Sequence, residues 1–162
     1  MTPVYIGIGS NLDHPLNHVK QAILELSQLA DSEYLASSAL YRSAPLGPAE
    51  QPDYFNAVSL LQTRLAPLDL LDHLQAIERV HGRVRDGQRW RPRPLDLDLL
   101  LYGEKIINDP RLQVPHPGLH VRSFVLYPLQ DIDPTLVIPG HGPLQELIKQ
   151  CPHIELERLD LS

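Results

Sequence analysis

The sequence lacks several features that would place it at once in a class of protein. Among 162 residues there is one cysteine, Cys151, so no disulfide can form within the chain, as is typical of a reducing cytoplasm. No apolar run approaches the roughly 20 residues that a membrane helix needs. The start, "MTPVYIGIGSNL", has no basic stretch of the kind that opens a signal peptide. We therefore expect one cytoplasmic domain, residues 1–162, with no membrane partner.

Two common nucleotide-binding signatures are also missing. In "GIGSNL", Gly7 and Gly9 follow an apolar stretch, but Leu12 stands where a dinucleotide fingerprint needs a third glycine. We interpret these two glycines as positions of close packing. The pattern G-x-x-x-x-G-K-[ST] does not occur in the sequence. If the chain binds ATP, arginine side chains rather than a glycine loop must hold it.

Positive charge is scarce overall but concentrated in one segment. The formal net charge of −6 argues against nucleic acid as the main partner. Only Asp86 opposes a run of arginines that makes up six of the eleven in the chain. These are Arg79, Arg83, Arg85, Arg89, Arg91 and Arg93. Arginine favours planar, bidentate recognition of phosphate or carboxylate, so the segment indicates an anionic ligand.

Periodic apolar residues predict a small α+β fold. The expected strands cover residues 3–9, 34–43, 54–63 and 95–103, and the expected helices begin near Pro15 and Pro67. Asp13 or His14 can cap the first helix. The resulting β-α-β-β-α-β order predicts a ferredoxin-like antiparallel sheet with two helices on one face. Beyond it we expect a hairpin at "EKIIND", a helix over 121–129 stopped by Pro128, a helix at "PLQELIKQC" and an edge strand at "IELERLDL".

Two carboxylates interrupt the last predicted strand. Asp96 and Asp98 are two residues apart, so they face the same side of the strand, roughly 7 Å apart. Like charges so placed resist burial unless cations join them. A salt-bridge network with Arg91 and Arg93 is one possibility, and Mg²⁺ bound to both carboxylates and to phosphate oxygens is the other. An arginine-rich loop beside the pair favours a metal–polyphosphate site, as phosphoryl transfer requires.

Histidines and aromatic residues mark further candidates. His14 with His18, and His116 with His120, have the spacing of zinc ligands, but Pro117 and Gly118 break the second pair, and we interpret both pairs as surface histidines. Tyr54 ends a proline-rich loop over 44–53, Trp90 lies among arginines, and Phe124 follows Arg122. Core packing is the simplest interpretation of Tyr54 and Phe124. A flat heteroaromatic ligand is the alternative, with Asn56 pairing its polar edge.

Four segments together resemble a known enzyme family. They are "YIGIGSNL", "LGPAEQPDYFNAV", "GRVRDGQRWRPRPLDLDLLLYG" and "VPHPGLHVRSFVLYPL", in this order over nearly the whole chain. They resemble 6-hydroxymethyl-7,8-dihydropterin pyrophosphokinase of folate biosynthesis. The resemblance implies transfer of the β,γ-pyrophosphoryl unit of ATP to the hydroxymethyl group of the pterin, with release of AMP. It implies ATP and a pterin as small-molecule partners, two Mg²⁺ ions, and a monomer.

The resemblance also implies roles for particular residues. Asp96 and Asp98 correspond to ligands of the two Mg²⁺ ions, and Arg83 and Arg93 join them as the catalytic set. The ATP side corresponds to Gln75, Glu78, Arg85, Trp90, Arg93, His116 and Arg122. The pterin side corresponds to Ser43, Ala44, Leu46, Tyr54, Asn56, Trp90 and Phe124. Loops over 9–13, 44–53 and 82–93 are expected to close over both substrates.

The sequence departs from the family pattern at three places. Asp86 stands where a basic residue is expected, Gly118 follows "PHP" where arginine is common, and "RSAPLG" replaces the commoner "RTPPLG". None of these changes touches Asp96 or Asp98, so we expect altered kinetics rather than lost activity. A ferredoxin-like module that binds RNA through aromatic strands remains the alternative, although the acidic charge and the paired aspartates oppose it.

Overall fold

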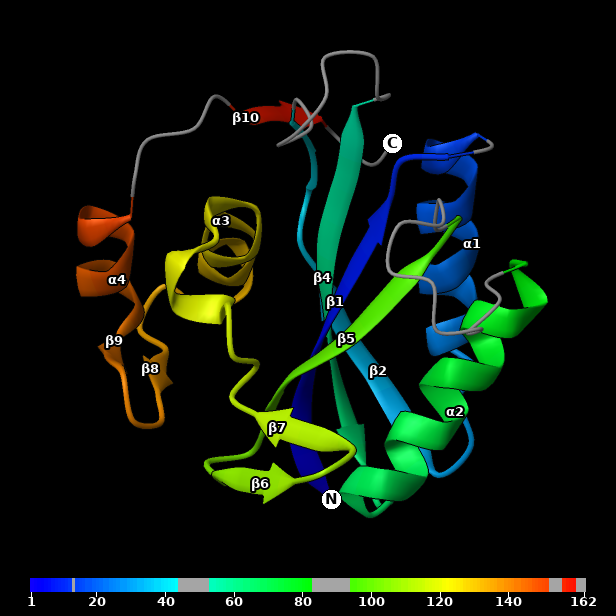
Figure 1. Cartoon of the computed structure of the whole chain (residues 1–162), viewed down its shortest axis with the longest axis horizontal. Coiled ribbons are helices and arrows are strands. Elements are labelled where there is room, and N and C mark those ends of the chain that lie inside the picture. The colour runs from blue at the N-terminus through cyan, green and yellow to red at the C-terminus, as the bar shows by residue number, and fades with distance from the viewer. Residues whose placement is uncertain (13, 44–52, 83–93, 152–155, 160–162) are drawn as a thin grey trace.

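The computed structural model describes residues 1–12, 14–43, 53–82, 94–151 and 156–159. A six-stranded sheet runs through the middle of the molecule in the order β10-β3-β4-β1-β5, and β2 also pairs with β4 (Figure 1). Every pair of neighbouring strands in it is antiparallel. The strands are β1 (Thr2–Ser10), β2 (Ser32–Ser37), β3 (Leu40–Ser43), β4 (Tyr54–Thr63), β5 (Asp96–Tyr102) and β10 (Leu156–Leu159). With the two helices between them, the first strands have the expected ferredoxin-like order.

Two helices cover one face of this sheet. These are α1 (Pro15–Leu26) and α2 (Pro67–Val80), and each has proline in its first turn as predicted. Leu70 and Leu74 are fully buried, whereas Val80 is 80% exposed, so His81 rather than Val80 continues the buried side of α2. His14 precedes α1 with a left-handed backbone (φ 63°) and makes no side-chain cap, while Asp13, the other expected cap, lies outside the described residues.

The predicted strand over 34–43 is two strands. β2 ends at Ser37, and β3 begins at Leu40 after a change of register along β4. Ser38 makes the break possible, because its hydroxyl accepts the Val58 amide at 2.9 Å while its own amide donates to the Val58 carbonyl. The side chain therefore replaces one backbone partner where the ladder is interrupted, a local bond that the alternation of apolar residues does not encode.

The C-terminal part contributes to both faces of the sheet: residues 107–114 pack on the side of α1 and α2, and the two helices after them cover the other face. It contains β6 (Ile107–Asp109), β7 (Leu112–Val114), a 3₁₀ turn (Leu119–Val121), α3 (Ser123–Ile132), β8 (Val137–Ile138), β9 (Gly142–Pro143) and α4 (Leu144–Gln150). β10 is an edge strand beside β3, as expected. The hairpin expected at "EKIIND" lies further along, because Ile107–Asp109 pairs with Leu112–Val114 in a separate two-stranded sheet. The expected stop at Pro128 is wrong, because Pro128 lies inside α3. Its ring is buried, and packing outweighs its poor helix propensity.

Hydrophobic side chains form one core on each face of the sheet. Val4, Ile6 and Ile8 of β1 pack with α1 and α2, whereas Tyr5 packs with α3 and α4. Along β5, Leu97 and Leu99 belong to the first core and Leu100 to the second. Strand alternation therefore places Asp96 and Asp98 on the α3 face of the sheet, with Leu100. The two charged residues interrupt only that face.

Candidate functional site

Asp96 and Asp98 lie opposite the two glycines of β1. In the register of the sheet, Gly9 is the neighbour of Asp96, and Gly7 is the neighbour of Asp98. On the far side of β1, Gly9 also pairs with Asn56 and Gly7 with Val58. Cross-strand partners point to the same face of the sheet. In each of these two rows, a glycine without a side chain therefore lies between a residue of β4 and an aspartate of β5. These glycines form the floor of a pocket.

The first pocket lies over this floor. It has a cavity volume of about 330 Å³. Its walls come from β1, β4 and β5, from the last residue of β3, and from the start of α3. The lining residues that the sequence predicted for a pterin are Ser43, Tyr54, Asn56 and Phe124, and both aspartates line it too. The structure thus brings together the metal candidates and all the predicted pterin residues that it describes. Ala44, Leu46 and Trp90 lie outside the described residues.

Asn56 is held in place by its close packing against Gly9. A Cβ atom on Gly9 would lie 2.8 Å from the Asn56 Oδ1 atom, closer than such contacts occur. Asn56 is 8% exposed. A buried carboxamide offers a fixed donor and a fixed acceptor, which suits the polar edge of a heterocycle. The glycines are positions of close packing, as interpreted from the sequence, and in addition they shape the pocket.

Arg122 lies in the first pocket, although the resemblance put it on the ATP side. Its guanidinium stacks near the Phe124 ring, with the Cζ atom 5.8 Å from the ring centroid. A Cβ atom on Gly118 would lie 2.6 Å from Arg122 Nε. Glycine at position 118, one of the departures from the family pattern, therefore leaves the space that the Arg122 side chain occupies.

A second pocket adjoins the first at Asp98. It has a cavity volume of about 600 Å³ and lies between α2, β5 and the β6–β7 hairpin. Two of the residues predicted for ATP, Gln75 and His116, line it, and so does Asp98. Asp98 is therefore common to both pockets. An acceptor group in the first pocket and a phosphate chain in the second would meet beside this carboxylate.

His116 is an uncharged lining residue of the second pocket. Burial, with the nearby positive charge of Arg122, lowers the pKa of His116 below its usual value. The Nδ1 atom of His116 accepts the backbone N–H of Gly118 at 3.2 Å. That hydrogen bond places the imidazole proton of the neutral ring on Nε2. His116 therefore offers a neutral N–H donor rather than a cation.

Glu78, a further predicted ATP residue, lines neither pocket. It is 1% exposed, and its carboxylate accepts the backbone N–H of Leu97 at 2.9 Å. Ser10 makes a comparable bond, since its hydroxyl donates to the carbonyl of Pro94. The two contacts fix the start of β5 against α2 and β1. Leu97 lies between Asp96 and Asp98 in the chain, so its hydrogen bond to Glu78 helps to position both aspartates.

The paired aspartates suit Mg²⁺ bound together with a phosphate. Within the described ranges, no group of three or more His, Cys, Asp or Glu side chains is arranged to hold a metal. Mg²⁺ needs no such cage: it keeps several waters and binds through one or two carboxylates plus substrate phosphates. Two hard carboxylates beside a row of glycines, at the junction of two pockets, fit that donor set.

The predicted arginine segment falls outside the described ranges. Arg83, Arg85 and Arg93, the phosphate-binding candidates, lie outside the described residues, as do Asp86 and Arg91. Of the zinc-spaced histidines, His18 contacts His81, the residue directly after α2, with their Nδ1 atoms 2.6 Å apart.

The sequence reasoning missed the contribution of the β6–β7 hairpin to the second pocket. Asn108, Asp109, Arg111 and Gln113 all line it. Arg111 forms an ion pair with Asp72 of α2, which ties the hairpin to the helix. The available signal was a polar "NDPR" turn with one isolated arginine, close behind the strand with the aspartates. The expected hairpin was placed at "EKIIND", and the charge of the turn that follows was not connected with the site.

Comparison with known proteins identifies close relatives. The family profile described as 7,8-dihydro-6-hydroxymethylpterin-pyrophosphokinase (HPPK) matches residues 5–134. A 2-amino-4-hydroxy-6-hydroxymethyldihydropteridine pyrophosphokinase of Pseudomonas aeruginosa is 51% identical over 156 residues, 96% of each chain. The enzyme of the same name from Haemophilus influenzae is 48% identical over 160 residues, 99% of each chain.

Solved structures show the same fold. A crystal structure of Plasmodium falciparum HPPK-DHPS superposes with a TM-score of 0.73 at 13% sequence identity. The match covers 92% of the present chain and 45% of that chain, so the present chain spans less than half of the solved one. At this identity the similarity shows the fold alone, and it agrees with the ferredoxin-like prediction.

Proposed function

The chain belongs to the 7,8-dihydro-6-hydroxymethylpterin-pyrophosphokinase family, and from this we propose how its two pockets divide the reaction. It is an ATP-dependent pyrophosphokinase of folate biosynthesis, which transfers a pyrophosphoryl group to hydroxymethyldihydropterin. In our proposal the first pocket takes the pterin and the second takes ATP. The observation that carries this division is Asp98, which lines both pockets.

The first pocket suits a flat, polar-edged ring. We propose that Asn56 pairs with the amide-like edge of the pterin, while Tyr54 and Phe124 pack on its faces. Ser43 adds a hydroxyl at the end of β3. With the ring so held, the hydroxymethyl group would extend toward Asp96 and Asp98. A buried amide that must be matched also discriminates against rings without the complementary groups.

The second pocket suits a nucleoside triphosphate. Gln75 and the neutral N–H of His116 can donate hydrogen bonds to uncharged or anionic oxygens, and Arg111 of the hairpin adds a cation. In the reaction the pterin hydroxyl oxygen forms a bond to the β-phosphorus and loses its proton. The bond between that phosphorus and the oxygen bridging to the α-phosphate breaks, and AMP leaves with the electron pair. Correct placement of the two oxygens in line is the main task of such a site.

Asp96 and Asp98 would hold Mg²⁺ in this scheme. When bound, two such ions would supply positive charge that balances the phosphates and makes the phosphorus a better electrophile. The carboxylates of this chain contribute by presenting fixed oxygens on a rigid strand. Glu78 and Ser10 position the backbone of this strand. The position of the metal would therefore be determined by the sheet rather than by a loop.

The arginine segment would complete the ATP side. We propose that Arg83, Arg85 and Arg93 contact phosphates, with Trp90 closing over the ligands, and that these roles belong to a segment able to open again for product release. We further propose that the chain acts as a monomeric single domain in the cytoplasm. Its lone cysteine supports that compartment. In the described part of the chain, no helix has the length and apolar character needed to cross a membrane.

Product analysis tests the proposed function. The purified chain is incubated with Mg²⁺, ATP and 6-hydroxymethyl-7,8-dihydropterin, and nucleotides are separated by chromatography. We expect AMP and the pterin diphosphate in equal amounts, and no AMP when the pterin is omitted. Formation of ADP in place of AMP would mean transfer of a single phosphoryl group and would refute the proposal.

A further inference from the structure

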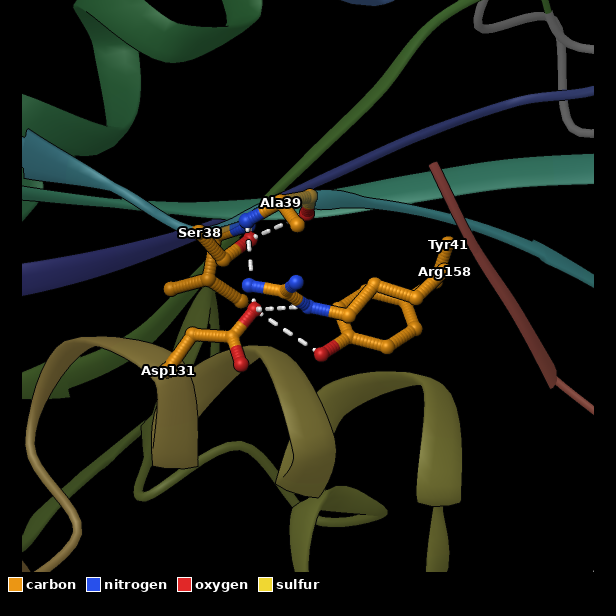
Figure 2. A network of polar contacts seen from close by, with 6 residues as sticks. Ser38, Ala39, Tyr41, Asp131 and Arg158 are labelled. Atoms are coloured by element: carbon orange, nitrogen blue, oxygen red, sulfur yellow. Dashed lines mark hydrogen bonds and ion pairs between the residues drawn. The ribbon is translucent and has the colours of Figure 1, made fainter. Parts of the chain in front are cut away.

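Asp131 joins three elements behind the first pocket. The residue lies on α3, and one of its carboxylate oxygens, Oδ2, accepts the Tyr41 hydroxyl at 2.8 Å and the Ala39 backbone N–H at 3.2 Å. The Arg158 Nε atom of β10 lies 3.7 Å from the same oxygen (Figure 2). The Asp131 side chain is 20% exposed, so the bonds are partly shielded from water. One oxygen thus links α3 to β3 and to β10.

The linked elements are walls of the first pocket. Phe124 and Val125, which line it, lie in the first turn of α3, and Asp131 is about two turns further on, roughly 10 Å along the axis. Tyr41 and Asp131 are not among the residues that line the pocket. They are placed to set the distance between the helix wall and the sheet wall.

Tyr41 stands in the same row of the sheet as the pterin candidate Asn56. The register pairs Tyr41 with Asn56, Asn56 with Gly9, and Gly9 with Asp96. Cross-strand partners point to the same face, so Tyr41 is the outer neighbour of Asn56 on the α3 side. Gly9 is the neighbour of Asn56 on the inner side, where a Cβ atom would lie 2.8 Å from the Asn56 Oδ1 atom. The carboxamide therefore lies between a glycine and an anchored tyrosine.

A second contact ties the same corner to β4. Ser38, which is 2% exposed, exchanges two hydrogen bonds with Val58, a lining residue of the pocket. Figure 2 shows Ser38 next to Ala39, the residue whose N–H donates to Asp131. If α3 moved away from the partners of Asp131, the positions of both β3 and β4 would therefore change.

The hydroxyl of Tyr41 stays protonated at neutral pH, so it remains a hydrogen-bond donor there. Burial, together with the hydrogen bond to Asp131, raises the pKa of Tyr41 to about 12. A raised folded-state pKa means that this stabilisation is complete below the ordinary value of 10 and is lost as pH rises toward 12. The Tyr41 hydroxyl is thus protonated at neutral pH and can donate to Asp131.

We propose that Asp131 and Tyr41 are positioning residues for pterin recognition. By fixing α3 against β3, the pair holds Phe124 and Asn56 at the spacing that a pterin ring requires. Neither residue touches the substrate. The inference rests on the proposed assignment of the first pocket to the pterin.

A matched pair of tyrosine variants tests this role. Tyr41→Phe removes the hydroxyl that donates to Asp131. Tyr102→Phe removes a hydroxyl that donates to the Leu65 carbonyl, away from the residues of either pocket. The two tyrosines are 6% and 5% exposed, so each change removes one buried hydrogen bond and should lower the melting temperature to a similar extent.

Steady-state kinetics separates positioning from plain stability. With ATP saturating, Tyr41→Phe and Asp131→Ala should raise the KM for the pterin about tenfold, as loss of roughly one hydrogen bond implies. The KM for ATP and kcat should stay within about twofold. Asp131→Asn keeps an acceptor oxygen and should restore the pterin KM to within about threefold. Arg158→Ala should change little, because an exposed ion pair contributes little.

The outcomes distinguish this inference from the pocket assignment. If Tyr41→Phe and Tyr102→Phe change the pterin KM equally, or Tyr41→Phe leaves it unchanged, Asp131 and Tyr41 only stabilise the fold. Asn56→Ala is measured beside them. If Asn56→Ala raises the pterin KM while Tyr41→Phe does not, the pocket assignment stands and the positioning role is overturned. If Asn56→Ala also has no effect, the assignment of the pocket itself is wrong.

Discussion

The two pockets are neighbours but are built in different ways. The first stands on rows of the central sheet, where cross-strand register fixes each lining residue against its neighbours. The second lies between the surface of α2, β5 and a short hairpin, is larger, and has polar and charged residues of the hairpin on one side. Rigid, close-fitted walls suit discrimination between flat rings, and an open polar surface suits a long anion. Only Asp98 belongs to both pockets as described.

Replacing either aspartate should have the largest effect on the reaction. Asp96→Asn and Asp98→Asn should each lower kcat/KM by about a thousandfold, because metal charge is lost where phosphate charge develops. The fold should survive, since removing one of two like charges relieves repulsion. Asp133→Asn, outside both pockets, serves as the control. Near-normal turnover of either variant at saturating Mg²⁺ would rule out the metal role.

Asn56→Ala should affect the pterin and spare ATP. The change leaves the polar edge of the ring unmatched, so the dissociation constant for the pterin should rise about 30-fold, from roughly 2 kcal/mol for an unsatisfied buried group. Calorimetry with each ligand alone gives both values. Gln62→Ala, further along β4, is the control for disturbance of the strand. Equal losses for both ligands would mean that Asn56 supports the fold and not the substrate.

Gly9→Ala should act through Asn56. A methyl group at position 9 would lie 2.8 Å from Asn56 Oδ1, so the carboxamide must move, and the pterin KM should rise about tenfold. The Gly9→Ala/Asn56→Ala double variant tests whether Gly9 acts through Asn56. If the glycine acts only by leaving room for the amide, adding Gly9→Ala to Asn56→Ala should cost less than about threefold. Full additivity of the two effects would show that Gly9 acts independently.

Gln75→Ala should reverse the pattern of Asn56→Ala. Gln75 lines only the second of the two pockets, so its loss should weaken ATP by about fivefold, as for one partly exposed hydrogen bond. Pterin binding measured in the absence of nucleotide should not change. An effect confined to the pterin would contradict the division of the two pockets.

His116 gives the smallest expected effect, on stability. Because its folded-state pKa is lowered, the unfolded chain binds a proton more readily, and stability should fall as pH drops from about 6.5 through that lowered pKa. His116→Asn keeps an acceptor for the Gly118 N–H but cannot titrate. Melting temperatures between pH 7.5 and 5 should therefore depend less on pH in the variant. An unchanged slope would show that His116 is not the residue responsible.

Much of the fold was predictable because periodicity records which side of an element is buried. β4 begins and ends where alternation predicted, at Tyr54 and Thr63. The break between β2 and β3 was not predictable, because it depends on Ser38 bonding to a residue of another strand. The continuation of α3 past Pro128 was missed for a similar reason, since burial of the proline ring is a tertiary effect.

The candidate site was predictable in its chemistry more than in its arrangement. The spacing of Asp96 and Asp98 gave their common face, and the resemblance gave Asn56, Tyr54 and Phe124, which the structure places together. Neither source indicated that Gly118 makes space for Arg122, because that contact depends on backbone geometry. The part of the hairpin around Arg111 was missed because nothing local ties it to a pocket on α2 and β5.

A co-crystal structure with Mg²⁺, a pterin and a non-hydrolysable ATP analogue tests the division of the site most directly. The account predicts the pterin ring in the first pocket with its polar edge on Asn56, the nucleotide along Gln75 and His116, and the pterin hydroxymethyl group and β-phosphate meeting at Asp96 and Asp98. A pterin bound away from Asn56, or a phosphate chain that does not approach Asp98, would contradict it.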